Sequence, residues 1–167
     1  MAESNRDRIN PSLLDRLTDD APGNPSARGG AAATLSELRK SVLRDLNWLF
    51  NTSQLLKAEE AESWPQVRNS VVNYGLPPLS GLNASGLDLV QLERSLRQAI
   101  IDFEPRILPD SVTVKVLRES LDNHNVISLH IEGLLWAQPL PVELLLRTRL
   151  DLESGQSKVD ETVAGRR

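Results

Sequence analysis

The spacing of apolar residues changes once along the chain, and this change most constrains the fold. Up to Pro105, apolar residues recur every three or four positions, which is the period of one face of an α-helix. From Val112 onward they alternate with polar residues, which is the period of a strand with one buried face. Helices followed by consecutive strands predict an α+β fold, with N-terminal helices packed on a C-terminal antiparallel β-sheet of three to four strands.

The first long helix is predicted to begin after Thr34 and to end near Asn51. Thr34 and Glu37 have the spacing of a capping box, in which each residue satisfies the other's free backbone N–H. One apolar stripe then follows at helical steps, formed by Leu35, Leu38, Val42, Leu46 and Leu49. A charged stretch (57–62) leads to a short helical piece over 66–74, which Gly75 stops.

A second long helix is expected to begin at Asn83 or Ser85 and to end at Pro105, because proline cannot continue a helix. Its wide apolar face consists of Leu89, Leu92, Leu96, Ala99, Ile100 and Phe103.

Three strands are predicted beyond this helix, each with one apolar face. Residues 122–125 (DNHN) have the composition of a hairpin turn, and 159–163 forms a short last strand. The predicted buried faces are Val112, Val114 and Val116; Ile127, Leu129 and Ile131; and Val142, Leu144, Leu146, Thr148, Leu150 and Leu152.

The N-terminal segment 11–18 (PSLLDRLT) is predicted to form one short helix, with Leu13, Leu14 and Leu17 on one side. Residues 19–33 are rich in Pro, Gly, Ala and Ser, which is typical of a flexible linker. So small a helix cannot bury its own leucines, and it must dock on its own domain or on a partner. We therefore divide the chain into a docking helix with linker (1–33), one α+β domain (34–155) and a C-terminal strand or tail (156–167).

Composition excludes several classes of function. The chain has 167 residues, a formal net charge of −4 and no cysteine, which excludes disulfide scaffolds, thiol nucleophiles and thiolate metal sites. An acidic chain is not expected to bind nucleic acid. The N-terminus has no export signal and no apolar run is long enough to cross a membrane. We expect a cytoplasmic protein without membrane insertion.

Catalytic and cofactor motifs are scarce. There is no dinucleotide-binding or complete phosphate-binding glycine loop, and no nucleophile elbow. His124 and His130 lie six residues apart, near Asp122 and Glu132, so a metal site is conceivable. A turn histidine and a solvent-facing strand histidine explain the same pattern better, and we expect no metal and no cofactor.

The sequence Glu104-Pro105-Arg106 stands at the end of the second long helix. A helix C-terminus carries partial negative charge, which favours Arg106 and disfavours Glu104. Residues two apart across a proline are expected to diverge, so that each charge seeks another partner. The segment is then a solvated helix end, a charged contact for another chain, or the place of a catalytic carboxylate.

Five segments in order carry a resemblance to a known family. They are PSLLDRL (11–17), RDLNWLFNT (44–52), VRNSVVNYGLPPLSG (67–81), LERSLRQAIIDFEPRI (92–107) and LRTRLDLESG (146–155). This chain resembles the TssE family of type VI secretion baseplate wedge subunits, which is grouped with the small baseplate wedge proteins of contractile-tailed phages. That group was historically labelled lysozyme-like.

The resemblance implies a cytoplasmic, non-enzymatic structural subunit that binds other baseplate wedge subunits and the contractile sheath. It implies that Glu104, Pro105 and Arg106 help to hold the sheath in register. It also implies that a sheath strand adds to the sheet by β-augmentation. With these partners, the helix 11–18 would dock a wedge subunit through Leu13, Leu14 and Leu17.

The older family label implies an alternative, a peptidoglycan glycosidase with Glu104 as the acid. Such an enzyme needs two carboxylates on either side of a sugar cleft. Asp102 and Glu93 are the candidates for the second carboxylate. Helical geometry opposes both, because Glu93 lies three turns away and Asp102 points elsewhere.

Overall fold

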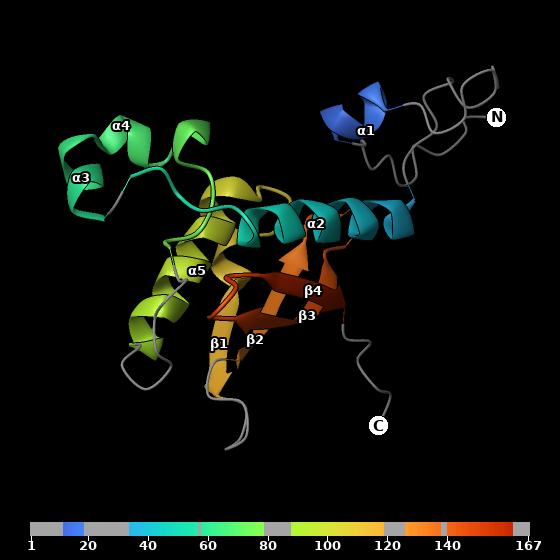
Figure 1. Ribbon diagram of the computed structural model, residues 1–167. Helices are drawn as coiled ribbons and strands as arrows, with labels where there is room; N and C mark the ends of the chain where they lie inside the picture. The colour runs from blue at the N-terminus through green and yellow to red at the C-terminus, as the bar shows by residue number, and fades with distance from the viewer. Residues whose placement is uncertain are drawn as a thin grey trace, which may run out of the picture.

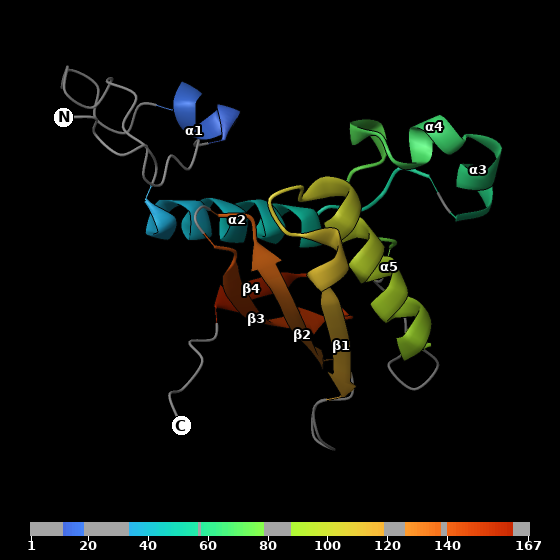
Figure 2. The same ribbon diagram turned by 180° about the vertical axis from the view of Figure 1, so that it is seen from behind.

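The alternating segments form one antiparallel sheet with the strand order β1-β2-β3-β4. The computed structural model describes residues 12–18, 34–56, 58–78, 88–118, 126–137 and 140–161. The strands are β1 (Thr113–Arg118), β2 (Val126–Leu135), β3 (Val142–Asp151) and β4 (Ser157–Glu161). Helices precede this sheet (Figures 1 and 2), so the predicted α+β fold is confirmed. The turn predicted at 122–125 lies outside the described residues.

The helical elements are α1 (Leu13–Leu17), α2 (Leu35–Phe50), α3 (Ala58–Ser63), α4 (Pro65–Arg68), η2 (Val71–Asn73), α5 (Leu89–Phe103) and η3 (Pro109–Ser111). The capping box of α2 is present as predicted. The Glu37 backbone N donates to Thr34 Oγ1 over 3.2 Å, and the Thr34 backbone N donates to Glu37 Oε2 over 2.7 Å. Of the predicted stripe on α2, Leu35 in the first turn is exposed.

Two helix predictions were wrong in their bounds. The N-cap of α5 is Asp88, whose Oδ1 accepts from the backbone N–H groups of Val90 and Gln91, and not Asn83 or Ser85. Aspartate caps a helix as well as serine or asparagine does, so local chemistry does not distinguish these sites. The single piece expected over 66–74 is two short helices, α4 and η2, and the charged stretch before it contains α3.

The hydrophobic core lies between α2, α5 and one face of the sheet. Both long helices lie next to the sheet, with α5 alongside β1 (Figures 1 and 2). The alternation predicted from the sequence is confirmed in all three strands: of the predicted faces, all residues but Val142, which is half-buried, are buried. The largest fully buried side chains are Leu46, Leu49, Leu96, Ile100, Ile107, Ile127, Leu129, Ile131, Leu135, Leu144, Leu150 and Leu152. No described helix is long and apolar enough to span a membrane.

An arm formed by residues 53–76 carries α3, α4 and η2 away from the sheet (Figure 1). A parallel bridge between Ser53 and Leu76 closes its base. Gly75 has a φ of 127°, and a Cβ there would lie 2.4 Å from the Thr52 carbonyl oxygen. The side chain of Asn73, 1% exposed, accepts from the Leu56 backbone N–H over 2.9 Å. The sequence Asn-Tyr-Gly therefore closes the arm, and glycine is required because no other residue fits its conformation and space.

Candidate partner-binding site

The Glu104-Pro105-Arg106 corner is an internal ion pair. Arg106 Nε donates to Glu104 Oε1 over 2.6 Å and Nη2 donates to Glu104 Oε2 over 2.5 Å. Glu104 is 2% exposed. The expectation that the two charges diverge was therefore wrong. Glu104 leaves helical geometry at φ −123° and ψ 77°, and the long arginine side chain folds back across the proline turn.

Arg106 also binds α2. Its Nη2 donates to Asp45 Oδ2 over 2.6 Å and its Nη1 to the buried Ser41 hydroxyl over 3.0 Å. Burial alone would lower the pKa of Arg106, but the hydrogen bonds and negative charges of Glu104 and then Asp45 outweigh it and raise that pKa above its ordinary value. The guanidinium therefore clamps the end of α5 to the middle of α2.

At the corner, the Asn-Tyr-Gly segment of the arm meets the Glu-Pro-Arg segment at the end of α5. Tyr74 of the arm donates its hydroxyl to the Asp45 backbone oxygen over 3.2 Å. Its ring packs edge-on against Phe103, with 5.2 Å between ring centroids. Burial first, and then the negative charges of Asp45 and Glu104, raise the pKa of Tyr74. One polar cluster thus joins α2, the arm and the end of α5.

The outer side of the corner is partly apolar. Pro105 is exposed, and Trp136, which is also exposed, donates its backbone N–H to the Arg106 carbonyl oxygen over 2.8 Å.

Arginine has five N–H donors, of which four bind Glu104, Ser41 and Asp45 as described above. The second hydrogen of Nη1 has no acceptor among the described residues, and the Arg106 side chain is 22% exposed. Sequence reasoning missed Trp136, although tryptophan is enriched at binding hot spots.

The helix α1 turns its polar side to the body and its leucines outward. Leu13, Leu14 and Leu17 are 70%, 42% and 75% exposed. Asp15 accepts from Arg44 Nη1 of α2 over 2.5 Å. Burial raises the pKa of Asp15, but hydrogen bonds from Ser12 and Arg44 and the charge of Arg44 outweigh it, and that pKa is lowered. Among the described residues, the ion pair of Asp15 with Arg44 joins α1 to α2, and the three leucines of α1 are exposed.

The two edges of the sheet differ. At β1, two α5 side chains bind the edge: Glu93 Oε1 accepts from the Val116 backbone N–H over 2.8 Å, and Arg97 Nε donates to the Val112 carbonyl oxygen over 2.9 Å. At β4, the Asn51 amide exchanges two 2.9 Å hydrogen bonds with the Ser157 backbone, as a neighbouring strand would. Beyond Ser157, no described strand pairs with the outer edge of β4.

The carboxylates required by the glycosidase alternative are not arranged around a cleft. Glu104 is buried against Arg106, Glu93 binds the β1 edge, and Asp102 accepts from Gln98 over 2.8 Å. In the part of the chain that the structure describes, no group of three His, Cys, Asp or Glu is placed to hold a metal, and His124 lies outside it.

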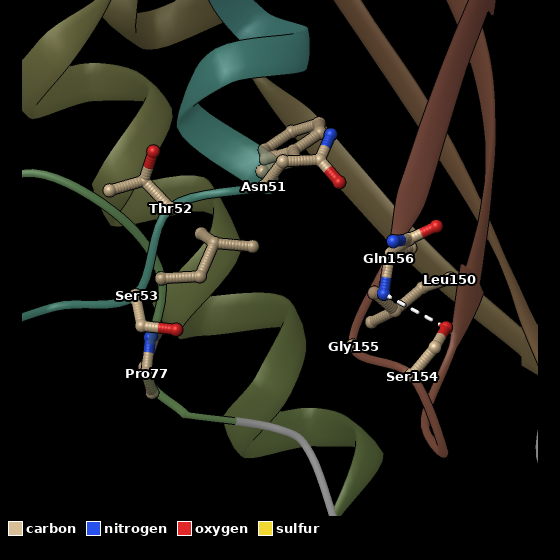
Figure 3. Close-up of a pocket in the computed structure, with 10 residues that line it drawn as sticks. Asn51, Thr52, Ser53, Pro77, Leu150, Ser154, Gly155 and Gln156 are labelled. Carbon is tan, nitrogen blue, oxygen red and sulfur yellow. Dashed lines mark hydrogen bonds between the residues drawn. The ribbon is translucent and has the colours of Figure 1, made fainter.

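A pocket of about 300 Å³ lies between the end of α2, the base of the arm and the β3–β4 turn (Figure 3). It is lined by Phe50, Asn51, Thr52, Ser53, Leu76, Pro77, Leu150, Ser154, Gly155 and Gln156. None of these residues is charged or a histidine, so the pocket offers no group for acid–base catalysis.

Within the described residues, this α+β subunit has an internal charge clamp, a helix with three exposed leucines and an edge strand, β4, that pairs with one strand only, which are features of an assembly component. The family described as baseplate wedge protein gp25 matches residues 36–140, which is more than half of the chain. The chain belongs to this family, a structural family of phage-like contractile baseplates that includes TssE. The match begins in α2 and contains the Glu104–Arg106 corner and Trp136. No curated protein and no solved structure matches the chain.

Proposed function

We propose that this chain is the TssE-type baseplate wedge subunit of a type VI secretion system, acting in the cytoplasm without catalysis. It binds other wedge subunits and anchors the contractile sheath or initiates its assembly. The family match over 36–140 carries this proposal. The uncovered α1, the corner and the β4 edge supply three surfaces for the partners that such a role requires.

The first of these surfaces is α1, which docks another wedge subunit through Leu13, Leu14 and Leu17. Complete burial of one leucine side chain contributes about 1.5–3 kcal/mol, so covering all three favours a stable complex. The short chain 1–33, which contains α1, is then the docking segment, and residues 34–155 form the body. The ion pair of Asp15 with Arg44 sets the orientation of α1 before the partner arrives.

The second surface is the corner, with Pro105, Arg106 and Trp136 as contacts and Glu104 as support from behind. A partner's oxygen atom accepts the remaining Nη1–H of Arg106, while Pro105 and Trp136 cover apolar atoms. The three residues of the motif therefore have different roles in binding the partner. Arg106 touches the partner, and Glu104 fixes the guanidinium in place.

The third surface is the outer edge of β4, which accepts a strand from a sheath subunit. Support comes from the backbone contacts at the two edges. Glu93 and Arg97 of α5 bind the backbone of Val116 and Val112 at the β1 edge. At β4, the side chain of Asn51 binds the Ser157 backbone, and α2 reaches the other end through the side-chain pair of Arg39 with Glu161. Backbone hydrogen bonds supply affinity in such strand addition, and alternating side chains supply register.

Purification of the full tagged chain from its own cells, with mass spectrometry of what co-purifies, tests this function. We expect wedge and sheath proteins with the wild type, and loss of the wedge proteins with Leu13→Ser/Leu17→Ser. The control is Leu55→Ser/Val90→Ser, which removes two similarly exposed apolar side chains elsewhere and should keep the partners. Recovery of no wedge or sheath protein with the wild type would contradict the proposal.

A further inference from the structure

A continuous line of charged side chains joins α1 to the corner. Asp15 of α1 accepts from Arg44 Nη1 over 2.5 Å, and Arg44 Nε donates to Asp45 Oδ1 over 2.9 Å. The other oxygen of the same carboxylate, Asp45 Oδ2, accepts from Arg106 Nη2 over 2.6 Å. Arg106 in turn pairs with Glu104. Charges of alternating sign therefore run from α1 to the Glu-Pro-Arg motif, and Asp45 is where the two arginines meet.

Arg44 is incompletely bound in this line. Its Nη2 atom is buried and has no hydrogen-bond partner among the described residues. The Nε–H and one Nη2–H of an arginine are parallel, and a carboxylate that faces them accepts one hydrogen bond from each. Arg106 binds Glu104 in this way, through Nε to Oε1 and Nη2 to Oε2. Arg44 has only half of this arrangement with Asp45, because the oxygen that its Nη2 needs, Oδ2, binds Arg106 instead.

Two guanidinium groups thus compete for Asp45 Oδ2. A buried donor without a partner costs free energy, so Arg44 gains stability if its Nη2 takes this oxygen from Arg106. Asp15 opposes that exchange, because its negative charge binds Arg44 from another side and offsets part of the attraction between Arg44 and Asp45. Without Asp15, the full charge of Arg44 acts on Asp45.

Movement of α1 leaves the competing groups in place. The pair of Asp15 with Arg44 is partly exposed, and such pairs contribute little, so a partner that covers the α1 leucines can draw the helix away. Arg44 and Asp45 both lie on α2. The Arg44 Cζ atom is also 5.2 Å from the ring centroid of Trp48, one turn further along, and a cation over a tryptophan face is attracted to it. The guanidinium is therefore held beside Asp45 when Asp15 leaves.

We propose that Asp45 is a positioning residue that couples α1 to the corner, through the competition between Arg44 and Arg106. When a partner draws α1 away, Arg44 binds both oxygens of Asp45, and Arg106 Nη2 is free to donate to an oxygen atom of a protein at the corner. Coupling of this kind is reciprocal, so a ligand on Arg106 also loosens α1. The inference rests on the proposed function, and it implies that the partner of α1 binds before the partner of the corner.

NMR of the free, full-length chain tests the coupling. No partner is needed, so failure of this test is distinguishable from failure of the proposed function, which co-purification measures. The readout is the exchange of the Arg106 Nη2 hydrogens with water, which hydrogen bonding slows. We expect Asp15→Asn to speed this exchange at least about threefold, as for residues coupled in one network. The backbone amide signals of α5 should stay unchanged, because Arg106 keeps its bonds to Glu104.

Glu161→Gln is the matched control. Glu161 pairs with Arg39 of α2 over 2.6 Å, with side chains 25% and 32% exposed, and the corresponding values for Asp15 and Arg44 are 25% and 33%. The control therefore removes the same charge from an equally exposed ion pair on the same helix. It should leave the exchange within about 1.5-fold of the wild type, because distant sites that share no partner act independently.

Arg44→Gln tests the route of the coupling, and Arg44→Met is a second variant of the same kind. Either change removes one of the two competitors, so Arg106 should keep Asp45 Oδ2. Adding Asp15→Asn to these variants should then change the exchange no further. Circular dichroism verifies that each variant is folded.

The proposal would be overturned if Asp15→Asn left the Arg106 exchange unchanged. Equal acceleration by Glu161→Gln would also overturn it, because the effect would then come from net charge alone. An effect of Asp15→Asn that persists in both Arg44 variants would overturn it as well, since α1 would then reach the corner by a route that does not pass through Arg44.

Discussion

The corner and α1 are both predicted to bind partners, but they differ in which of their groups are used inside the chain and which are exposed. At the corner, the charges of Glu104 and Arg106 are used within the chain, and little of the ion pair reaches solvent. In α1, Asp15 pairs with Arg44 of α2, and Leu13, Leu14 and Leu17 are exposed. The comparison shows that an unusual charged motif in a sequence can be a fastening inside the molecule, while a plain leucine helix is the part left uncovered.

Because of this difference, the corner contributes mainly to the stability of the folded chain and α1 mainly to partner binding. Removing one partner of a buried charge pair leaves an uncompensated charge, whereas removing an exposed leucine changes little in the folded chain. Variants at the corner should therefore act mainly on unfolding, and variants in α1 mainly on assembly.

Arg106→Ala should have the largest effect. It leaves Glu104 buried with its charge unpaired, and the expected loss in the free energy of unfolding is about 3–5 kcal/mol by urea denaturation. The double variant Glu104→Leu/Arg106→Met should recover most of that loss, because replacing both members of a buried pair with apolar side chains is often neutral. A loss below about 1 kcal/mol for Arg106→Ala would show that the corner behaves as a surface ion pair.

The double variant also separates the two roles of Arg106. If the exposed edge of the guanidinium touches a partner, the refolded double variant stays defective in sheath assembly although it is stable. Normal assembly with this variant would mean that the corner is a fastening only.

Gly75→Ala should come next, with a loss of about 1–3 kcal/mol. The residue has a φ of 127° and a new Cβ would meet the Thr52 carbonyl oxygen, so the base of the arm must shift. Because Tyr74 is its neighbour, the hydroxyl contact with Asp45 should weaken too. Gly155→Ala is the control: its φ of 70° gives a similar backbone cost on the β3–β4 turn, away from the arm. An equal chemical-shift change around Phe103 in both variants would contradict the coupling of arm and corner.

Lowering the pH should release α1 with a smaller effect, below about 1 kcal/mol because the ion pair is partly exposed. The pKa of Asp15 is lowered in the folded chain, so its stabilisation is present at neutral pH and is lost as the pH falls below about 4 through the folded pKa. Hydrogen exchange of residues 13–18 at two pH values measures this release. Asp15→Asn should remove the pH dependence, and its persistence in that variant would assign it to another group.

Leu13→Ser/Leu17→Ser should have the smallest effect on unfolding, within about 0.5 kcal/mol of the wild type. Both side chains are largely exposed, so little apolar surface is lost from the folded state. A destabilisation of 2 kcal/mol or more, of the order expected for a buried leucine, would show that α1 docks on its own domain through its leucines.

The sequence predicted the parts of the fold that depend on local pattern. The cap of α2 follows from two residues three apart, and the buried faces of the strands follow from alternation. The start of α5 could not be predicted, because several residues in that segment cap a helix equally well and tertiary packing determines which of them is used. The corner was misjudged for a related reason. The partners of Arg106 on α2 lie about sixty residues away, and only the fold brings Asp45 and Ser41 within reach.

Trp136 was missed because a single tryptophan in an apolar run looks like core. In the structure it follows directly after β2, which ends at Leu135, its side chain is exposed, and its backbone N–H binds the Arg106 carbonyl oxygen. The contact between Tyr74 and Asp45 joins segments that no local pattern relates. Long-range polar contacts such as these define most of the candidate site, which is why less of the site than of the fold could be predicted.

Imaging of a fluorescent sheath protein in the source cells tests the central claim most directly. The chain is deleted and then restored as the wild type or as Leu13→Ser/Leu17→Ser, with equal expression verified by immunoblot. We predict no assembled sheaths after deletion, full recovery with the wild type, and few or none with the leucine variant. Sheaths that assemble normally without the chain would contradict its assignment as a wedge subunit required for sheath assembly.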